Sequence, residues 1–182
     1  MIRIVRATKK DAKDLQAIQK RAFKEDLIKY GDDEYNPANE TLEKIEMKIE
    51  KFDYFAILND THIIGGIDIR RNKNNHYRLS RIYLEPEYHN QSIGTKVIHL
   101  IEAMFPDAIH WSLDTPHLNY KNQYFYEKLG YVRIGENKIS DKLILIDYIK
   151  RVWKRYIVYR TPIIKYKTEI FNIKTMSKMS TF

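Results

Sequence analysis

Residues 86–97 constrain the fold of this chain more than any other stretch of its sequence. An apolar segment that ends at Leu84 runs into a short polar loop, and an amphipathic helix begins at once near Gly94. A strand, a short loop and a helix in this order aim several backbone N–H groups at one point, where a phosphate or pyrophosphate can bind. Gly94 permits close approach of the backbone, and Thr95 adds a hydroxyl. An ordinary strand–loop–helix turn has the same pattern, so other evidence must decide between the two interpretations.

The length of 182 residues, with 43% hydrophobic and 31% charged residues, is typical of a globular domain. The chain contains no cysteine, which excludes disulfides, thiolate metal ligands and a cysteine nucleophile, and is compatible with a reducing compartment. Residues 1–6 resemble a strand rather than the apolar core of a signal peptide. No apolar run approaches the roughly 20 residues that cross a bilayer. We therefore expect a cytoplasmic protein.

The net charge of +8 is concentrated at the C-terminus, because residues 151–182 contain eight Lys or Arg and one acidic residue. This segment also interleaves aromatic residues with the basic ones: Trp153, Tyr156, Tyr159, Tyr166 and Phe171. We expect a domain over residues 1–150 and a basic, aromatic-rich extension over 151–182. For the extension, packing on the body or in a homo-oligomer, or partial disorder, is favoured over contact with nucleic acid or an anionic membrane.

Hydrophobic periodicity predicts an alternation of helices and strands along the chain. The spacing predicts helices near 12–22, 42–52, 94–105 and 120–129, and strands near 1–6, 54–58, 63–71, 77–84, 108–114, 131–135 and 142–149. Residues 8–11 resemble a capping box, residues 30–37 and 136–141 read as loops, and Pro116 should end the fifth strand. The order predicts a mixed sheet with helices on both faces, in the α/β or α+β class.

A second motif lies downstream of the loop, where Asn119 is followed seven residues later by Tyr126 within the run Tyr-Glu-Lys-Leu-Gly-Tyr. With the loop and the element order, it makes residues 1–150 resemble a GNAT-superfamily N-acetyltransferase. The family signature Q/R-x-x-G-x-G/A reads His-Asn-Gln-Ser-Ile-Gly at residues 89–94. The resemblance implies a mostly antiparallel central sheet flanked by helices on both faces.

The resemblance also implies acetyl-CoA as co-substrate and a set of residues that bind it. These residues are Ile82, Tyr83, Leu84, His89, Asn90, Gln91, Ser92, Ile93, Gly94, Thr95, Asn119 and Tyr126. The loop amides would hold the pyrophosphate, and the strand edge at 82–84 would pair with the pantetheine arm. Asn119, or less favourably Asn122, would hydrogen-bond that arm, and Tyr126 would protonate the departing CoA thiolate.

The chain departs from the family pattern at three positions. His89 replaces the usual Gln or Arg, and Ser92 replaces a glycine although serine tolerates positive φ poorly. Arg78 stands where many members carry a glutamate that acts as general base. An amine of pKa about 10.4 must lose a proton before it attacks, so another group has to accept that proton. The open alternatives are Glu85, Asp68, Asp114, a chain of waters, an amine of low pKa, or a site that has lost its activity.

The loop between the first two predicted helices is acidic and aromatic, with Tyr30, Asp32, Asp33 and Tyr35. It would attract a cationic acceptor such as a polyamine, an aminoglycoside or a peptide N-terminus, or it is simply a solvated loop. His110 and His117 have no acidic partner at metal-ligand spacing, so we expect no metal site.

The sequence thus favours an N-acetyltransferase that moves an acetyl group from acetyl-CoA to a primary amine of a small molecule or peptide, by direct attack in a ternary complex. A non-catalytic acyl-CoA-binding module that has lost its general base is the first alternative. A nucleic-acid-associated protein dominated by residues 151–182 is the second.

Overall fold

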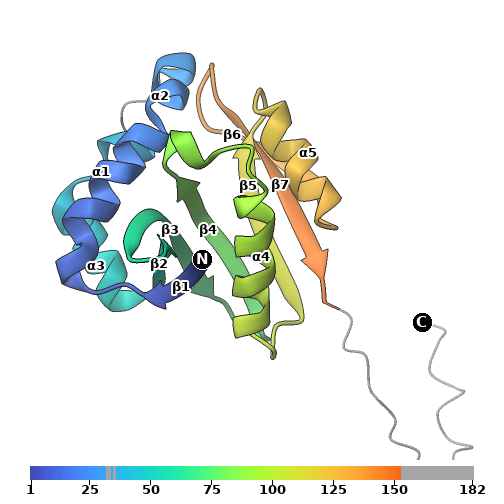
Figure 1. Cartoon of the computed structure of the whole chain (residues 1–182). Helices are drawn as coiled ribbons and strands as arrows, with labels where there is room; N and C mark the ends of the chain where they lie inside the picture. Colours follow the sequence, from blue (N-terminus) through green and yellow to red (C-terminus); the bar gives the residue numbers. More distant parts are fainter. Residues whose placement is uncertain (32–33, 35, 153–182) are drawn as a thin grey trace, which may run out of the picture.

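Seven strands form one mixed sheet in the computed structural model, which describes residues 1–31, 34 and 36–152 (Figure 1). They are β1 (Ile2–Arg6), β2 (Asp53–Asn59), β3 (His62–Arg71), β4 (His76–Leu84), β5 (His110–Pro116), β6 (Val132–Lys138) and β7 (Ile144–Arg151). Their order across the sheet is β1-β2-β3-β4-β5-β7-β6. Only β4 and β5 pair in parallel within this sheet, which confirms the expected mostly antiparallel arrangement.

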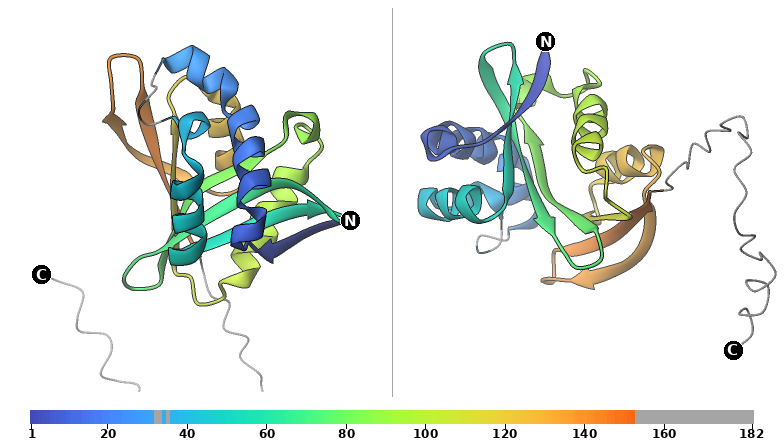
Figure 2. Two further views of the ribbon diagram at one scale, coloured as in Figure 1. Left: turned by 90° about the vertical axis from the view of Figure 1, so that its left-hand side faces the viewer. Right: turned by 90° about the horizontal axis from the view of Figure 1, so that it is seen from below.

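Helices cover both faces of the sheet, as the sequence predicts (Figure 2). They are α1 (Ala12–Ala22), α2 (Lys24–Tyr30), α3 (Leu42–Lys51), α4 (Ile93–Met104) and α5 (Tyr120–Lys128). One apolar core joins the sheet to α4 and α5, and a second joins it to α1 and α3. Within the described ranges, none of the helices combines the length and apolar character needed to span a bilayer. The predictions for residues 153–182 lie outside the described residues.

The sequence analysis did not predict α2, although the chain carries ordinary helix signals there. Glu25 and Asp26 lie in its first turn, Lys29 lies in its last turn, and Gly31 ends it at φ +58°. Two strand boundaries also differ from the prediction. β5 runs through Pro116 because β4 no longer pairs with β5 there, and a proline is tolerated at an unpaired strand edge. β6 continues to Lys138.

The sheet opens between β4 and β5, and this opening places the site. The two strands pair only over His76–Arg78 and residues 110–112, where Tyr77 and Trp111 pack with their ring centroids 5.4 Å apart. Ser80 has no partner in β3. Asp68 of β3 lies opposite residue 81 of β4, and the next residue, Ile69, lies opposite residue 79. Such a bulge increases the twist of its strand. The remaining parts of β4 and β5 diverge toward the end of the molecule where α2 lies (Figure 1).

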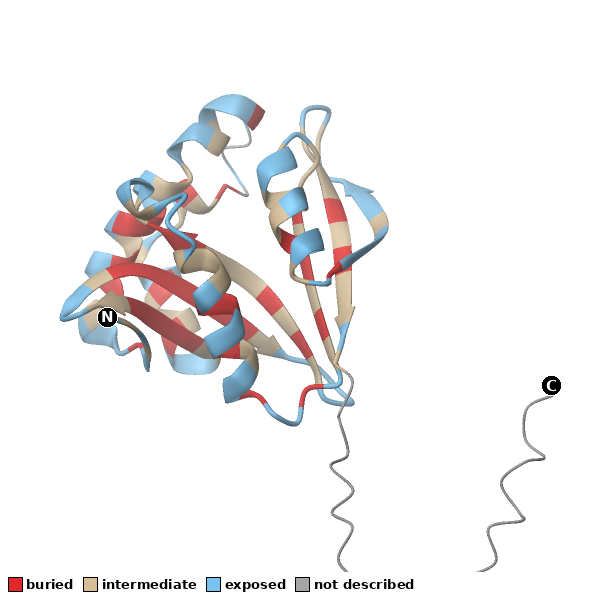
Figure 3. Ribbon diagram, turned by 45° about the vertical axis from the view of Figure 1, so that its right-hand side comes forward, coloured by how far each residue is buried: buried red, intermediate tan, exposed pale blue. Residues whose placement is uncertain are grey.

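Burial is strongest in the centre of the sheet and weakest on α5 and β6 (Figure 3). β5 shows the alternation of a half-buried strand, with Trp111, Leu113 and Thr115 buried. Trp111 and Leu113 belong to the apolar core. Thr115 is a buried polar residue, and it belongs to the candidate active site.

Candidate active site

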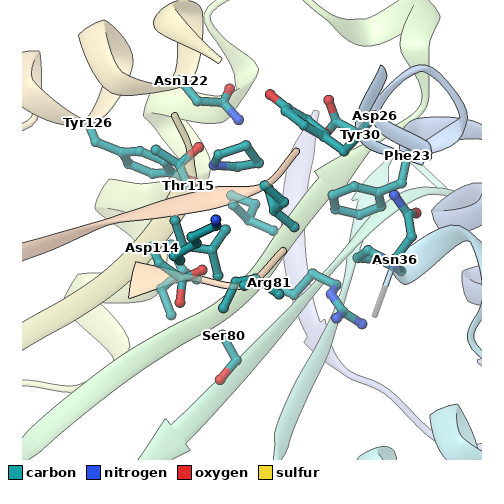
Figure 4. A pocket seen from close by; sticks show the side chains of 18 residues that line it. Phe23, Asp26, Tyr30, Asn36, Ser80, Arg81, Asp114, Thr115, Asn122 and Tyr126 are labelled. Carbon is teal, nitrogen blue, oxygen red and sulfur yellow. The ribbon is translucent and has the colours of Figure 1, made fainter. Parts of the chain in front are cut away.

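Two cavities lie in the opening between β4 and β5 and meet at a shared wall. The first, of about 580 Å³, lies among α2, β4, β5 and the β6–β7 hairpin (Figure 4). The second, of about 400 Å³, lies among the end of β4, the loop before α4 and α5. Five residues line both cavities: Phe23, Asp26, Ile82, Asn122 and Tyr126. A group bound in one cavity therefore meets a group bound in the other beside Tyr126.

The loop before α4 leaves a row of backbone donors free. Asn90 and Ser92 both adopt left-handed backbone angles, with φ of 61° and 58°. α4 begins directly after Ser92, so the first N–H groups of the helix have no acceptor within it. Among the described residues, no hydrogen bond is donated by the backbone N–H groups of residues 90–95. This geometry suits an anion such as a pyrophosphate.

Gly94 brings the start of α4 close to α5. A Cβ atom at this position would lie 3.3 Å from Cζ of Phe125. The packing of these two helices leaves little room for a side chain at residue 94, which adds to the close approach of a ligand that the sequence suggests.

The end of β4 is held rigidly from the opposite face of the sheet. The Tyr83 hydroxyl donates to the Leu15 carbonyl at 3.2 Å and lies 2.9 Å from the Tyr54 hydroxyl. The ring of Tyr83 passes over Gly66, where a Cβ would lie 2.4 Å from its hydroxyl. The strand edge at residues 82–84 has no strand pairing on its β5 side. It is therefore an open, fixed edge beside the second cavity.

Asn119 and Tyr126 come from the two ends of α5. Asn119 is the N-cap, and its Oδ1 accepts a hydrogen bond from the Asn122 backbone N–H at 3.1 Å. Its amide NH₂ group is not used by that bond. The Tyr126 side chain is 7% exposed and lies at the wall between the cavities. Burial and then the nearby charge of Asp114 raise the pKa of Tyr126 above its ordinary value.

The structure brings together most of the residues that the resemblance assigns to the cofactor. Those lining the second cavity are Ile82, Tyr83, Leu84, His89, Asn90, Ser92, Ile93, Gly94, Thr95, Asn119 and Tyr126. Gln91 does not line it, because its side chain turns back to the Glu87 carbonyl at 2.7 Å. Tyr30 lines the first cavity. Asp32, Asp33 and Tyr35 lie outside the described residues.

The three carboxylates considered as general base are all engaged elsewhere. Glu85 forms a bidentate ion pair with Arg21. Asp68 is buried outside both cavities and pairs with Arg70 at 2.7 Å. Asp114 lines the first cavity but forms an ion pair with Arg78. The carboxylate closest to the expected position of the general base, that of Asp114, is thus ion-paired with Arg78.

Sequence reasoning missed two residues of the first cavity, Asp26 and Thr115. Asp26 lies on α2, and burial raises the pKa of its carboxyl group. The helix signals around Asp26 are an acidic first turn and Gly31 at the end, and a helix there places Asp26 one turn before Tyr30. Thr115 follows the predicted strand at 108–114, yet it lies inside β5 and lines the first cavity. Within the described chain, no cluster of three potential ligands could hold a metal ion.

Comparison with known proteins agrees with this geometry. The family model described as the acetyltransferase (GNAT) family matches residues 13–131. Protein YrkN of Bacillus subtilis (strain 168), described as uncharacterized, is 39% identical over 79 residues, which are 42% of this chain and 43% of that protein. This match therefore spans less than half of its curated relative.

Two solved structures share the fold. The PaiA N-acetyltransferase of Thermoplasma acidophilum, in complex with coenzyme A, superposes with a TM-score of 0.69 at 20% identity, over 84% of this chain and 99% of that one. The ribosomal-protein-S18-alanine N-acetyltransferase of Escherichia coli gives 0.68 at 12% identity, over 87% and 100%. Since the family match covers well over half of the sequence, the chain belongs to the acetyltransferase (GNAT) family.

Proposed function

We propose that this protein is an N-acetyltransferase that moves the acetyl group of acetyl-CoA to a primary amine of a small molecule or peptide. The observation that carries the proposal is the meeting of two cavities at Tyr126, one suited to a thioester donor and the other walled by polar groups. Family membership supports acyl transfer. The coenzyme A in the T. acidophilum structure supports the choice of donor.

The donor would lie in the second cavity. Its pyrophosphate would accept hydrogen bonds from the free N–H groups at residues 92–95, and its pantetheine arm would run along the open edge of β4. The amide NH₂ of Asn119 can donate to the arm while its oxygen caps α5. The thioester then reaches the wall that both cavities share.

The acceptor amine would attack the thioester directly in a ternary complex. The chain has no cysteine that could carry a thioester intermediate. Tyr126 would give its proton to the CoA thiolate as the carbon–sulfur bond breaks. Its raised pKa keeps the phenol protonated at neutral pH, which is the state that a general acid requires.

A non-catalytic acyl-CoA-binding module is the second candidate. It is favoured by Arg78, which stands at the position of the family glutamate and neutralises Asp114. Turnover of any amine separates the two candidates. The division into a domain over 1–150 and an extension over 151–182, a cytoplasmic location and a homo-oligomer formed by the extension also stay proposals.

Thermal unfolding with acetyl-CoA, CoA and ATP tests the proposed donor. Ligand at a hundredfold over its Kd stabilises a protein by about 2.7 kcal/mol, which raises the Tm of a domain of this size by about 5–10 °C. We expect this shift with both acetyl-CoA and CoA but not with ATP. The absence of a shift with acetyl-CoA would contradict the donor site, and binding without turnover of any amine would favour the non-catalytic module.

A further inference from the structure

Two residues in the wall of the first cavity carry buried hydroxyl groups that the proposed acetyl transfer does not use. Thr115 and Tyr30 are each 2% exposed, and neither hydroxyl has a hydrogen-bond partner in the described part of the chain. The Leu118 backbone lies near the Tyr30 hydroxyl, but the two form no hydrogen bond of ordinary geometry. Buried polar groups are normally satisfied, so two unsatisfied ones in the wall of one cavity indicate a ligand with a polar group of its own.

The cavity also contains one carboxylate without an ion pair. Asp26 forms no hydrogen bond or ion pair with the described residues, and burial raises its pKa. The other charged side chains of the wall are each paired: Arg81 with Glu40 (2.6 Å), Asp114 with Arg78, and Lys138 with Asp141 (2.8 Å). A second ammonium would therefore find no unpaired carboxylate, and an acceptor carboxylate would find only Lys138, which is exposed and shared with Asp141. One positive charge complements this wall.

Asp26 lies where the chemistry must occur, because it lines both cavities together with Tyr126. Figure 4 shows Asp26 and Tyr30 on the α2 side of the cavity, opposite Asn122 and Tyr126 on α5. On its own helix, Asp26 has Glu25 and Lys29 as charged neighbours. The other charged side chains that line the cavities with it are Arg81, Asp114, Lys138 and, on α5, Lys121. The Lys29 ammonium donates to the Leu118 carbonyl at 2.8 Å and not to Asp26, and its charge offsets only part of the effect of burial on the Asp26 pKa.

We infer that the first cavity takes a compact amine with one positive charge and one neutral oxygen function, such as an amino alcohol, and that Asp26 binds its ammonium group and accepts its first proton. Thr115 and Tyr30 would hydrogen-bond the oxygen. This inference rests on the proposed acetyl transfer, and it names the acceptor class and the proton acceptor that the sequence left open.

Proton transfer accompanies each step of the proposed reaction. The ammonium gives one proton to Asp26, and the neutral nitrogen attacks the thioester carbon to form the carbon–nitrogen bond. The intermediate then loses the second nitrogen proton to water, the carbon–sulfur bond breaks, and the thiolate takes one proton from Tyr126. Asp26 releases its proton to solvent and Tyr126 regains one, so each turnover gives an amide, CoA thiol and one free proton.

A matched set of amines tests the acceptor class with the full-length protein. The four probes are 4-aminobutanol, pentylamine, 1,4-diaminobutane and 5-aminopentanoate, which differ only at the end remote from the reacting amine, and shorter and longer homologues accompany each. We expect the best amino alcohol to exceed its alkylamine, diamine and amino acid counterparts by at least tenfold in kcat/KM. The ratio of amino alcohol to alkylamine should fall severalfold in Thr115→Val and to about one in Thr115→Val combined with Tyr30→Phe. A diamine or amino acid preferred over every amino alcohol would overturn the assignment.

Asp26→Asn tests the proton acceptor. Without the carboxylate, the enzyme depends on amine that is already neutral, and this fraction rises tenfold per pH unit below the amine pKa of about 10.4. We therefore expect kcat/KM to fall at least a hundredfold at pH 7 and to climb about tenfold per unit from pH 7 to 9, more steeply than in the wild type. Asp14→Asn, an exposed aspartate on α1, is the matched control and should behave as wild type. A parallel pH profile in Asp26→Asn and wild type would refute the role.

Cofactor binding separates failure of this inference from failure of the proposed function. If acetyl-CoA does not stabilise the wild type, the donor site itself is wrong. If acetyl-CoA stabilises the wild type but no amino alcohol is acetylated or adds to the thermal shift, the acceptor assignment is overturned while the donor site stands.

Discussion

Replacing Ser92 with glycine should stabilise the protein, because Ser92 is held in a left-handed conformation at the start of α4. Its φ is 58°, and its side chain makes no capping hydrogen bond that would compensate. This conformation costs a residue with a Cβ about 1–2 kcal/mol, whereas the greater freedom of glycine in the unfolded chain costs about 0.5–1 kcal/mol. Ser92→Gly should therefore gain about 0.5–1 kcal/mol, or about 1–4 °C in Tm for a domain of this size.

Two control variants, measured by urea denaturation and thermal unfolding, isolate the cause. Ser92→Ala removes the hydroxyl but keeps the Cβ, so it should give none of the gain. Asn90→Gly should gain less than Ser92→Gly, since asparagine tolerates φ of 61° better than serine tolerates its own angle. If Ser92→Ala stabilised as much as Ser92→Gly, backbone strain would not be the explanation. If neither variant stabilised the protein, the left-handed angle would carry no measurable cost.

Three further substitutions probe the site. Gly94→Ala places a Cβ 3.3 Å from the Phe125 ring and should lower the free energy of unfolding, measured in urea, by about 1–3 kcal/mol. Adding Phe125→Leu should recover part of that loss, and no recovery would contradict the packing argument. Tyr126→Phe should lower kcat at least a hundredfold while the Kd for acetyl-CoA stays within twofold, and an unchanged kcat would remove its role as general acid. Asp26→Asn should raise the free energy of unfolding at pH 7, because a raised pKa means that the folded state disfavours the ionised form. That gain should shrink as the pH falls toward about 3.9, the ordinary pKa of an aspartate, and a gain independent of pH would show that its charge is not the cause.

The backbone geometry of the loop and of α5 could be predicted because it depends on local chain structure. A strand, a short loop and a helix produce the row of free N–H groups before α4 whatever the rest of the fold does. The strain at Ser92 was expected for another reason, since Ser92 stands where the family signature has a glycine, and its φ of 58° agrees with that expectation. Asn119 and Tyr126 are seven residues apart on α5, and their helical spacing fixes how far apart they lie.

The parts that could not be predicted depend on contacts between distant segments. The bulge at Ser80 and the short pairing of β4 with β5 open the sheet, and neither leaves a pattern in a single strand. The ion pair of Arg78 with Asp114 follows from that pairing, because it joins the two strands next to the point where they separate. The position of Asp26 does not depend on distant contacts, because α2 carries an acidic first turn and a glycine stop that are visible in the sequence.

Thr115 offers a test of whether the cavity was shaped for a ligand at the expense of stability. A buried hydroxyl without a partner destabilises the folded state by about 1–3 kcal/mol, and valine has the same shape without the hydroxyl. Thr115→Val should therefore raise the free energy of unfolding of the ligand-free protein while it weakens discrimination in favour of amino alcohols. A hydroxyl that serves the fold would give the opposite result in urea denaturation, with valine less stable than threonine. Stability and acceptor selectivity changing in opposite directions is the outcome that only a ligand-binding role explains.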